Sequence, residues 1–333
     1  MKKILVTGGC GFIGSNFVLH MLENHPDYHL VNLDALTYAG NPDNLRACES
    51  DARYTFVKGS IADAPLVTTL FDEHGFEAVV NIAAETHVDR SITGPMVFTE
   101  TNTAGTHVLL EQARRHWHGA TTERRFVQVS TDEVYGALGA EGLFTEQTPL
   151  APNSPYSASK AAGDLMARAY FKTYALPVVI TRCSNNYGPY QFPEKFIPLM
   201  IARALADERL PVYGDGLYTR DWLFVADHCA AIDRVLHEGA PGQVYNVGGN
   251  NEQRNIDVVK RVLSHLGKPE TLIEHVTDRP GHDRRYAIDA SKIRRELGWE
   301  PATDFDTGLA ATIDWYVQNR SWWEKLLHNV PAR

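Results

Sequence analysis

The stretch KILVTGGCGFIG, residues 3–14, decides the fold of this chain of 333 residues. Its apolar run 4–7 is typical of a strand, and Gly8, Gly11 and Gly14 follow that run and open a helical pattern. Glycines placed in this way allow a tight turn and a close approach of the backbone to a pyrophosphate at a helix N-terminus. The stretch therefore predicts a strand, a dinucleotide-binding turn and a helix.

Strand-like runs continue outward from this stretch and alternate with helical patterns. We expect further strands at 30–33, 54–57, 78–82, 126–129 and 178–181, and helices at 12–23, 98–117 and 157–174. Short continuous apolar runs suit strands that are covered on both faces, and strand followed by helix, repeated, forms βαβ units. The sequence therefore predicts an α/β fold with a doubly wound parallel Rossmann sheet.

The pattern changes after Arg182. The stretch NNYGPYQFPEKFIP, 185–198, contains a glycine and three prolines, so we expect no regular secondary structure there. A strand at 244–247 and helices at 256–266, 291–297 and 305–316 follow. We predict a dinucleotide-binding domain of residues 1–187 and 223–254, and a smaller C-terminal α/β substrate-binding lobe of residues 188–222 and 255–333.

Composition excludes several classes of protein. Lys and Arg number 32 against 41 Asp and Glu, so a net charge of -9 provides no basic field for nucleic acid or for an anionic membrane. No run approaches the roughly 18 apolar residues of a membrane span. The four cysteines are scattered without a zinc or disulfide spacing, and we interpret His116 and His118 as surface residues. We expect a soluble cytoplasmic protein without a metal site.

Asp34 closes the second expected strand, 20 positions after Gly14. A carboxylate at this place can accept hydrogen bonds from ribose hydroxyls. Residues 35–38 contain no Arg or Lys that would meet a 2′-phosphate, which favours NAD over NADP. The alternative interpretation is an aspartate that caps a turn.

Tyr156 and Lys160 are four residues apart in an expected helix, so both project from one face. An ammonium group beside a tyrosine favours tyrosinate and lowers the tyrosine pKa, which would make a base near neutral pH. Tyr54 and Lys58 have the same spacing in an expected strand, so the spacing alone does not decide.

Polar residues follow the strand 126–129, at the edge of the sheet where doubly wound folds bind ligands. Thr131 supplies a hydroxyl, and Asp132 and Glu133 supply two carboxylates. Because neighbours in a strand point to opposite faces, both carboxylates reach one site only if the chain has already turned at Asp132. Solvated turn residues or a helix cap remain the alternative.

Basic residues in the second half could clamp a diphosphate. The candidates are Lys195, Arg220, Arg279, His282, Arg284 and Arg285. The alternative is a set of surface salt bridges, above all for the last two.

Four stretches together resemble the extended short-chain dehydrogenase/reductases. They are TGGCGFIG (7–14), NIAAETHVDRS (81–91), VSTDEVYG (129–136) and YSASK (156–160). Four more narrow the resemblance to the dTDP-glucose 4,6-dehydratase family, over nearly the whole chain: TYAGNPDNL (37–45), NNYGPYQFPEKFIP (185–198), YTRDWLFVADH (218–228) and DRPGHDRRYAID (278–289).

The resemblance implies an NAD-dependent hydro-lyase that converts dTDP-glucose to dTDP-4-keto-6-deoxyglucose. The sugar would be oxidised at C4, lose water from C5 and C6, and receive the hydride back at C6. The family motifs assign Tyr156 and Lys160 to the oxidation, Thr131 to the C4 oxygen, Asp132 to the acid and Glu133 to the base. The resemblance also implies a homodimer that forms through the helices expected at 98–117 and 157–174.

The resemblance also implies two sets of binding residues. NAD would contact Gly8, Gly11, Phe12, Ile13, Gly14, Asp34, Ala35, Leu36, Thr37, Ser60, Ile61, Ile82, Ala83, Ala84, Thr101, Tyr156 and Lys160. The nucleotide sugar would contact Glu85, Thr131, Asp132, Glu133, Asn185, Asn186, Lys195, Phe196, Ile197, Pro211, Tyr213, Arg220, Asn255, Arg279 and His282.

One position departs from the family pattern. The family has Gly-Asp-Ile after the third strand, whereas this chain has Gly59, Ser60 and Ile61. We expect weaker NAD retention, because a neutral hydrogen bond replaces one to a charged group. Two other functions remain open: a UDP-sugar 4-epimerase or decarboxylase, which shares NAD and Tyr156, and a non-catalytic NAD-binding regulator.

Overall fold

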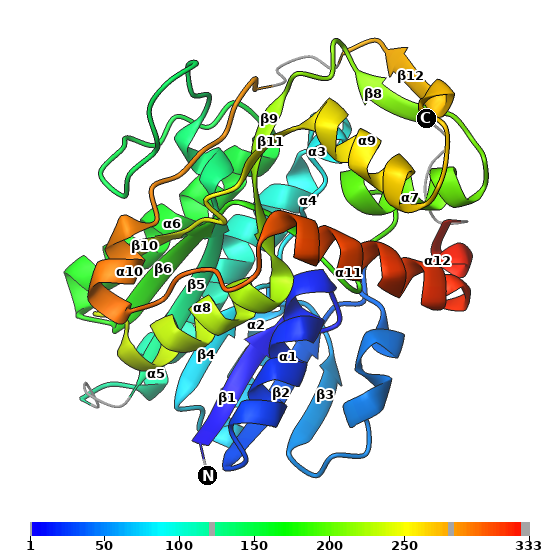
Figure 1. Ribbon diagram of the computed structural model, residues 1–333. Coiled ribbons are helices and arrows are strands. Elements are labelled where there is room, and N and C mark those ends of the chain that lie inside the picture. The colour runs from blue at the N-terminus through cyan, green and yellow to red at the C-terminus, as the bar shows by residue number, and fades with distance from the viewer. Residues whose placement is uncertain (1, 120–123, 279–282, 328–333) are drawn as a thin grey trace.

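The computed structural model describes residues 2–119, 124–278 and 283–327. A seven-stranded parallel sheet forms its centre, in the order β10-β6-β5-β4-β1-β2-β3 (Figure 1). The strands are β1 (Lys2–Thr7), β2 (Tyr28–Asp34), β3 (Tyr54–Lys58), β4 (Ala78–Asn81), β5 (Arg125–Thr131), β6 (Val178–Cys183) and β10 (Val244–Val247). The predicted Rossmann sheet is confirmed, and every strand expected from an apolar run is present.

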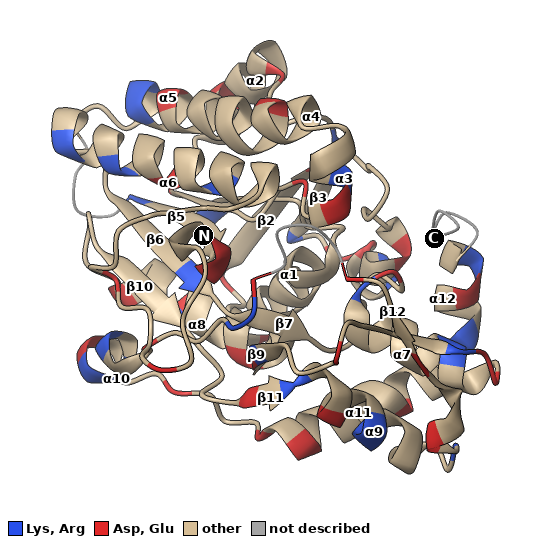
Figure 2. Ribbon diagram, turned by 90° about the horizontal axis from the view of Figure 1, so that it is seen from above, with Lys and Arg blue, Asp and Glu red and all other residues tan. Residues whose placement is uncertain are grey.

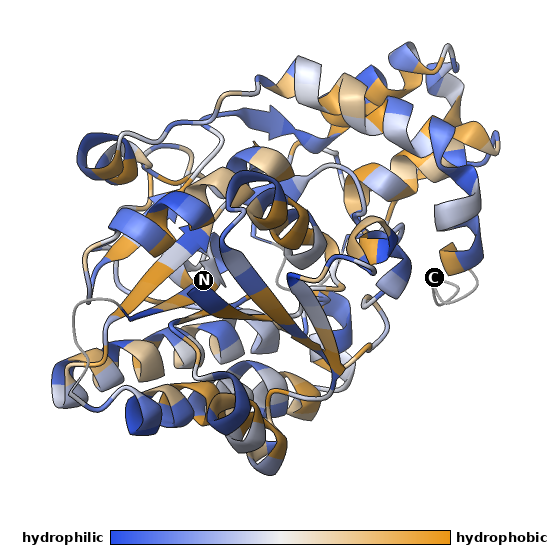
Figure 3. Ribbon diagram, turned by 90° about the horizontal axis from the view of Figure 1, so that it is seen from below, coloured by the Kyte–Doolittle hydropathy of each residue, from blue (hydrophilic) through white to orange (hydrophobic). Residues whose placement is uncertain are grey.

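Helices cover both faces of this sheet. On one face pack α1 (Phe12–Asn24), α8 (Val225–Glu238) and α10 (Ser291–Leu297), and on the other α2 (Ala64–His74), α5 (Thr106–His116) and α6 (Pro155–Tyr174). In β1, Ile4 and Val6 are buried on the first face and Leu5 on the second. This alternation is expected for a strand covered on both sides, and Figure 3 shows hydrophobic residues along the strands and flanking helices.

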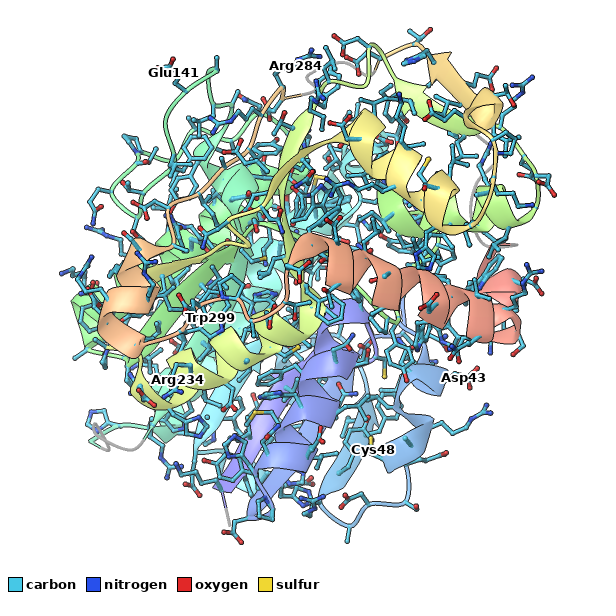
Figure 4. The ribbon with its side chains drawn as sticks, in the orientation of Figure 1. Asp43, Cys48, Glu141, Arg234, Arg284 and Trp299 are labelled. Atoms are coloured by element: carbon cyan, nitrogen blue, oxygen red, sulfur yellow. The ribbon has the colours of Figure 1, made fainter. Side chains whose placement is uncertain are left out.

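A smaller lobe with its own hydrophobic core lies beside the carboxyl ends of the large sheet (Figure 1). It contains a two-stranded sheet, β8 (Leu210–Tyr213) with β12 (Ile273–Val276), and a three-stranded sheet, β7 (Asn185–Tyr187), β9 (Thr219–Phe224) and β11 (Glu252–Arg254). Its helices are α7 (Phe196–Leu205), α9 (Asn255–His265), α11 (Phe305–Gln318) and α12 (Arg320–Leu327). Asp43, labelled in Figure 4, hydrogen-bonds Lys325 and so links α12 to the larger domain.

The expected helix at 98–117 is interrupted. Short helices α3 (Val88–Thr93) and α4 (Met96–Phe98) lead into a π-helical segment, Thr99–Gly105, before α5 begins. The Asn102 side chain accepts a hydrogen bond from Glu85 N at 2.9 Å and donates to Glu85 O at 3.0 Å. The wider turn therefore brings Asn102 onto the loop that follows β4, and π-segments inside helices are frequent at functional sites.

The expectation of no regular structure at 185–198 is wrong at both ends of that stretch. Asn185–Tyr187 forms β7, because β9 provides a parallel partner strand. Helix α7 begins at Phe196, and Pro198 is tolerated because the N–H groups of a first helical turn have no partner within the helix.

The proposed division into two domains is left as a prediction. Ile293, Leu297 and Trp299, which that division assigned to the smaller lobe, pack with α8 on the large sheet. Figure 4 labels Trp299 close to α8. In Figure 2 the charged residues of both signs are dispersed over the elements. Within the described ranges, no helix combines the length and the apolar character needed to span a membrane.

Candidate active site

A cavity of about 490 Å³ lies at the carboxyl ends of the parallel strands, where the strand order reverses between β1 and β4. Of the predicted cofactor residues, all except Leu36 line it, and so do the five predicted catalytic residues. Glu85, Asn185, Asn186 and Lys195 line it from the substrate set. One cavity therefore brings together residues from nine separate segments of the prediction, from the glycine turn to Lys195.

The glycine turn fits a group with a pyrophosphate. Gly8 has φ +70, and a Cβ on Gly14 would lie 2.0 Å from Gly8 O. Gly11, the N-cap of α1, offers no side chain to the N–H groups of the first helical turn. These N–H groups face the cavity beside Phe12 and Ile13, which line it, and they suit an anion at the helix N-terminus.

Asp34 is fixed by the backbone at the cavity edge. Its Oδ2 accepts a hydrogen bond from Cys10 N and its Oδ1 accepts one from Leu36 N, both at 2.8 Å. Burial raises the pKa of Asp34, and the two N–H donors oppose that shift. Each carboxylate oxygen keeps a second lone pair for a ribose hydroxyl.

The surroundings of Asp34 hold no partner for a 2′-phosphate. Lys160 and Lys195 are the only basic residues among the described residues that line the cavity, and both come from other segments. Ser60 lines the cavity, and its Oγ accepts a hydrogen bond from Ala62 N at 3.1 Å. These residues fit NAD.

Strand β5 ends at Thr131, and the chain turns at once into a 3₁₀ helix, Asp132–Tyr135. Thr131 Oγ1 accepts from Glu133 N and donates to Asp132 Oδ1, each at 3.3 Å. Asp132 and Glu133 both line the cavity. The predicted turn at Asp132 is present, and it stays a prediction that both carboxyl groups face the nicotinamide.

Asp132 is buried beside Glu133 at the cavity. Its side chain is fully enclosed, and burial, followed by the charge of Glu133, raises its pKa well above the ordinary range. Within the described part of the chain, Asp132 Oδ2 has no hydrogen-bond partner. Burial and a neighbouring carboxylate both favour the protonated form of a carboxyl group.

The expected lowering of the Tyr156 pKa by Lys160 is not found. Burial, then the charge of Glu133, raises the pKa of Tyr156 well above its ordinary value, and the Thr131 hydroxyl opposes this by a hydrogen bond. Lys160 Nζ instead donates to Val129 O at 2.7 Å. Burial lowers the pKa of Lys160, and the charge of Asp164 opposes that shift. Four residues of separation place both groups on one helix face without making them a pair.

Behind Lys160 lies a buried ion pair that the sequence analysis missed. Arg182 Nε donates to Asp164 Oδ2 at 2.9 Å, and Arg182 Nη1 donates to the Tyr135 hydroxyl at 3.0 Å. Tyr135 in turn donates to Asn246 Oδ1 at 2.7 Å. The network connects β6, α6 and β10 around the base of the site.

The residues predicted to contact the substrate fall into two groups. Lys195 Nζ donates to Thr86 O at 3.2 Å, and burial lowers the pKa of Lys195. Arg220 Nη2 donates to Asp283 O at 2.8 Å, and its guanidinium lies 4.5 Å from the Tyr286 ring centre. The residues that line the cavity do not include Phe196, Ile197, Pro211, Tyr213, Arg220 or Asn255, which lie in the smaller lobe, and Arg279 and His282 lie outside the described residues.

Arg284 and Arg285 form surface ion pairs, as the alternative interpretation held. Arg284 Nη2 lies 2.7 Å from Asp215 Oδ2, and Arg285 Nε lies 2.6 Å from Glu252 Oε2. Figure 4 labels Arg284 at the periphery of the molecule.

Cys183 and Thr86 also line the cavity and were missed from the sequence. Cys183 ends β6, and burial, followed by the charge of Asp132, raises its pKa to about 12, so it is an inert thiol. The rule that ligands bind at the carboxyl ends of parallel strands could have found it. No comparable signal marked Thr86.

The strand order, the glycine turn and the Thr131–Tyr156–Lys160 arrangement define a Rossmann protein of the short-chain dehydrogenase/reductase type. A profile of the GDP-mannose 4,6 dehydratase family matches residues 5–312. A dTDP-glucose 4,6-dehydratase of Xanthomonas campestris pv. campestris (strain B100) is 59% identical and is aligned over 98% of this chain and 96% of its own.

Two solved dTDP-glucose 4,6-dehydratases are similar in structure. The enzyme from Bacillus anthracis, in complex with NAD, has a TM-score of 0.91 and 52% identity, covering 98% of this chain and 100% of its own. The enzyme from Streptomyces venezuelae, with NAD bound, has a TM-score of 0.93 and 49% identity, covering 97% and 99%. This chain belongs to the dTDP-glucose 4,6-dehydratase family.

Proposed function

We propose that this chain dehydrates dTDP-glucose to dTDP-4-keto-6-deoxyglucose with NAD as a cofactor that is regenerated in each turnover. One observation carries the proposal: Asp132 and Glu133 line the same cavity as Thr131, Tyr156 and the glycine turn. An epimerase with the same cofactor domain has no need for a neighbouring acid and base. A regulator has no need for the complete set of reactive groups.

The residues that would hold NAD follow from the cavity. The N–H groups after Gly11 would bind the pyrophosphate, Asp34 the adenosine ribose, and Lys160 the nicotinamide ribose. When bound, NAD would supply an acceptor for the hydride from C4 and a donor of that hydride to C6, so the sugar loses water with no net oxidation.

Tyr156 and Thr131 act on the C4 hydroxyl. Tyr156 Oη takes the hydroxyl proton, and Thr131 Oγ1 hydrogen-bonds the same sugar oxygen as it becomes a carbonyl. Burial raises the pKa of Tyr156 and so opposes the tyrosinate, and the positive charge of bound NAD would favour it.

Glu133 and Asp132 carry out the elimination. The C4 ketone acidifies C5, Glu133 removes the C5 proton, and Asp132 protonates the departing C6 hydroxyl, which leaves as water. Glu133 then returns its proton to C5. The cycle closes when Tyr156 releases its proton to solvent and Asp132 regains one. Burial and the charge of Glu133 raise the pKa of Asp132, which favours the protonated acid that this step requires.

The substrate would extend from the cavity toward the smaller lobe. Two residues would provide positive charge for the diphosphate. They are Lys195, whose ammonium group donates to Thr86 O at the cavity wall, and Arg220. We include Arg279 and His282 in this set from the family motif. This arrangement accords with a division into an NAD-binding domain and a nucleotide-sugar-binding lobe.

The purified protein, incubated with dTDP-glucose and no added reductant, should form a product lighter by one water, as measured by mass spectrometry. UDP-glucose is the matched control for the base. An unchanged mass together with a changed sugar stereochemistry would identify an epimerase, and an unchanged sugar would leave only NAD binding. Either result would refute the dehydratase proposal.

We also propose that the chain forms a homodimer and works in the cytoplasm. Met96 and Val97 on α4 and Leu165 and Tyr174 on α6 are exposed large hydrophobic residues, and α4 and α6 contact each other. Exposed apolar residues gathered in this way are typical of an interface. Light scattering should give twice the chain mass, and Leu165→Asp should lower it toward the monomer. The cytoplasmic location is supported by the four buried cysteines, which are all free thiols.

A further inference from the structure

A cluster of three histidines surrounds one carboxylate at the opposite end of the large sheet from the cavity. His20 lies in α1, His25 is the C-cap of that helix, and Asp233 and His237 lie one turn apart in α8. The two helices pack side by side on one face of the sheet (Figure 1). Because α1 begins at the cavity and has 13 residues, its last turn lies about 20 Å from the glycine turn.

One nitrogen atom of each ring points at the Asp233 carboxylate. His25 Nε2 lies 2.9 Å from Oδ2 and 3.0 Å from Oδ1. His237 Nδ1 lies 2.8 Å from Oδ1, and His20 Nε2 lies 3.0 Å from Oδ2. The ligand atoms of His25, Asp233 and His237 all lie within 4.8 Å of one another.

This geometry has the chemistry of a transition-metal site. Zinc prefers imidazole nitrogen and carboxylate oxygen at about 2.0–2.2 Å, which separates tetrahedral ligands by roughly 3.3 Å. The separations between the histidine nitrogens and the Asp233 oxygens, 2.8–3.0 Å, reach that value with shifts of a few tenths of an ångström, and all three ligand atoms of His25, Asp233 and His237 lie within 4.8 Å of one another. An Asp and a His four residues apart on one helix present both ligands on the same face.

The surrounding residues orient the rings as supporting partners of a metal site do. The Tyr28 hydroxyl lies 2.6 Å from His237 Nε2, which leaves His237 Nδ1 directed at the cluster. The same Nδ1 lies 2.8 Å from the Asp233 carbonyl oxygen, and a bound ion would replace this hydrogen bond. The His25 ring stacks on both Tyr28 and His237, with ring centres 4.6 and 4.9 Å apart. These contacts within the protein therefore fix the orientations of the His25 and His237 rings.

We propose that His25, Asp233 and His237 bind one divalent transition-metal ion of the zinc type. The ion would connect the end of α1 to α8. Binding replaces the hydrogen bonds between the histidines and Asp233, and the protons on the ligand nitrogens are released to solvent. The sequence pattern did not indicate this site, because its ligands come from two segments more than 200 residues apart.

The test is titration of the full-length, tag-free protein, loaded with NAD, with Zn²⁺ in a calorimeter. We expect one saturable site per chain. Both His25→Ala and Asp233→Asn should weaken it by at least about tenfold, and Tyr28→Phe, which removes only the supporting hydroxyl, should weaken it by about tenfold.

His265→Ala is the matched control, because His265 Nε2 forms a single pair with Asp314 Oδ1 at 2.9 Å between α9 and α11. It should leave Zn²⁺ affinity unchanged. Circular dichroism and NAD affinity verify that each variant is folded, since the cavity lies at the other end of α1. Saturable binding that persists in the Asp233→Asn and His25→Ala variants, or no saturable binding by the parent protein, would show that the cluster is an ion-pair network and would overturn the proposal.

Discussion

Replacing Gly14 by alanine tests the glycine turn as the site of pyrophosphate binding. A Cβ at Gly14 would lie 2.0 Å from Gly8 O and 2.7 Å from Gly9 Cα, whereas real Cβ contacts are essentially never shorter than 3.0 Å. The first pair of atoms must therefore separate by at least 1.0 Å, and both oxygen and carbon belong to rigid backbone. The turn therefore opens, and the N–H groups of the first turn of α1 no longer point at the position of the pyrophosphate.

A hydrogen bond to a charged group contributes about 1.5–3 kcal/mol, so losing two of them lowers NAD affinity by at least about 100-fold. Gly139→Ala is the matched control, because its Cβ meets nothing within 4 Å and its φ is not positive. NAD affinity is measured by calorimetry after removal of bound nucleotide, and circular dichroism monitors folding. A folded Gly14→Ala protein with NAD affinity within twofold of the parent would refute the assignment of this turn.

Four further outcomes are expected. Tyr156→Phe should lower kcat by about 10²–10⁴-fold with NAD affinity nearly unchanged, because the phenolic base is lost; turnover near the parent rate would exclude Tyr156 as the base. Ser60→Asp should tighten NAD binding by about tenfold in calorimetry, because a charged acceptor replaces a neutral one; equal or weaker binding would contradict this. Arg182→Met should cost about 3–5 kcal/mol in urea unfolding, because Asp164 is left buried without its partner, whereas the exposed Arg284→Met should cost less than about 1 kcal/mol. The folded pKa of Asp132 is raised, so its stabilising effect is complete below the unfolded pKa and is lost as the pH rises through the folded pKa. Asp132→Asn should therefore gain stability relative to the parent as the pH rises, and a constant difference would count against the raised pKa.

Most of the fold could be predicted because its strands are apolar on both faces. The runs around Ile4 and Val127 are buried under helices on both sides, so they are continuously apolar in the sequence. Such runs are typical of strands in a covered parallel sheet. The π-segment could not be predicted, since Asn102 is drawn to the Glu85 backbone by a tertiary contact. Strand β7 could not be predicted either, because it forms by pairing with β9. The proline-rich sequence around β7 does not indicate that partner strand.

The site divides in the same way. Residues at the carboxyl ends of strands, such as Asp34 and Thr131, could be placed from the sequence because a parallel sheet gathers those ends. The environment of Tyr156 and Lys160 could not be predicted in this way. Helix spacing places both side chains on one face, but it does not determine which acceptor the Lys160 ammonium group bonds. Lys160 bonds to Val129 O, and that carbonyl belongs to a strand 31 residues away.

The most direct test of the proposed reaction is the fate of the hydrogen at C4. The protein would be incubated with dTDP-glucose that carries deuterium at C4, and the product would be analysed by mass spectrometry and NMR. The account predicts a 4-keto product that has lost one water and carries the deuterium at C6. Deuterium retained at C4, or lost to solvent from a dehydrated product, would contradict it.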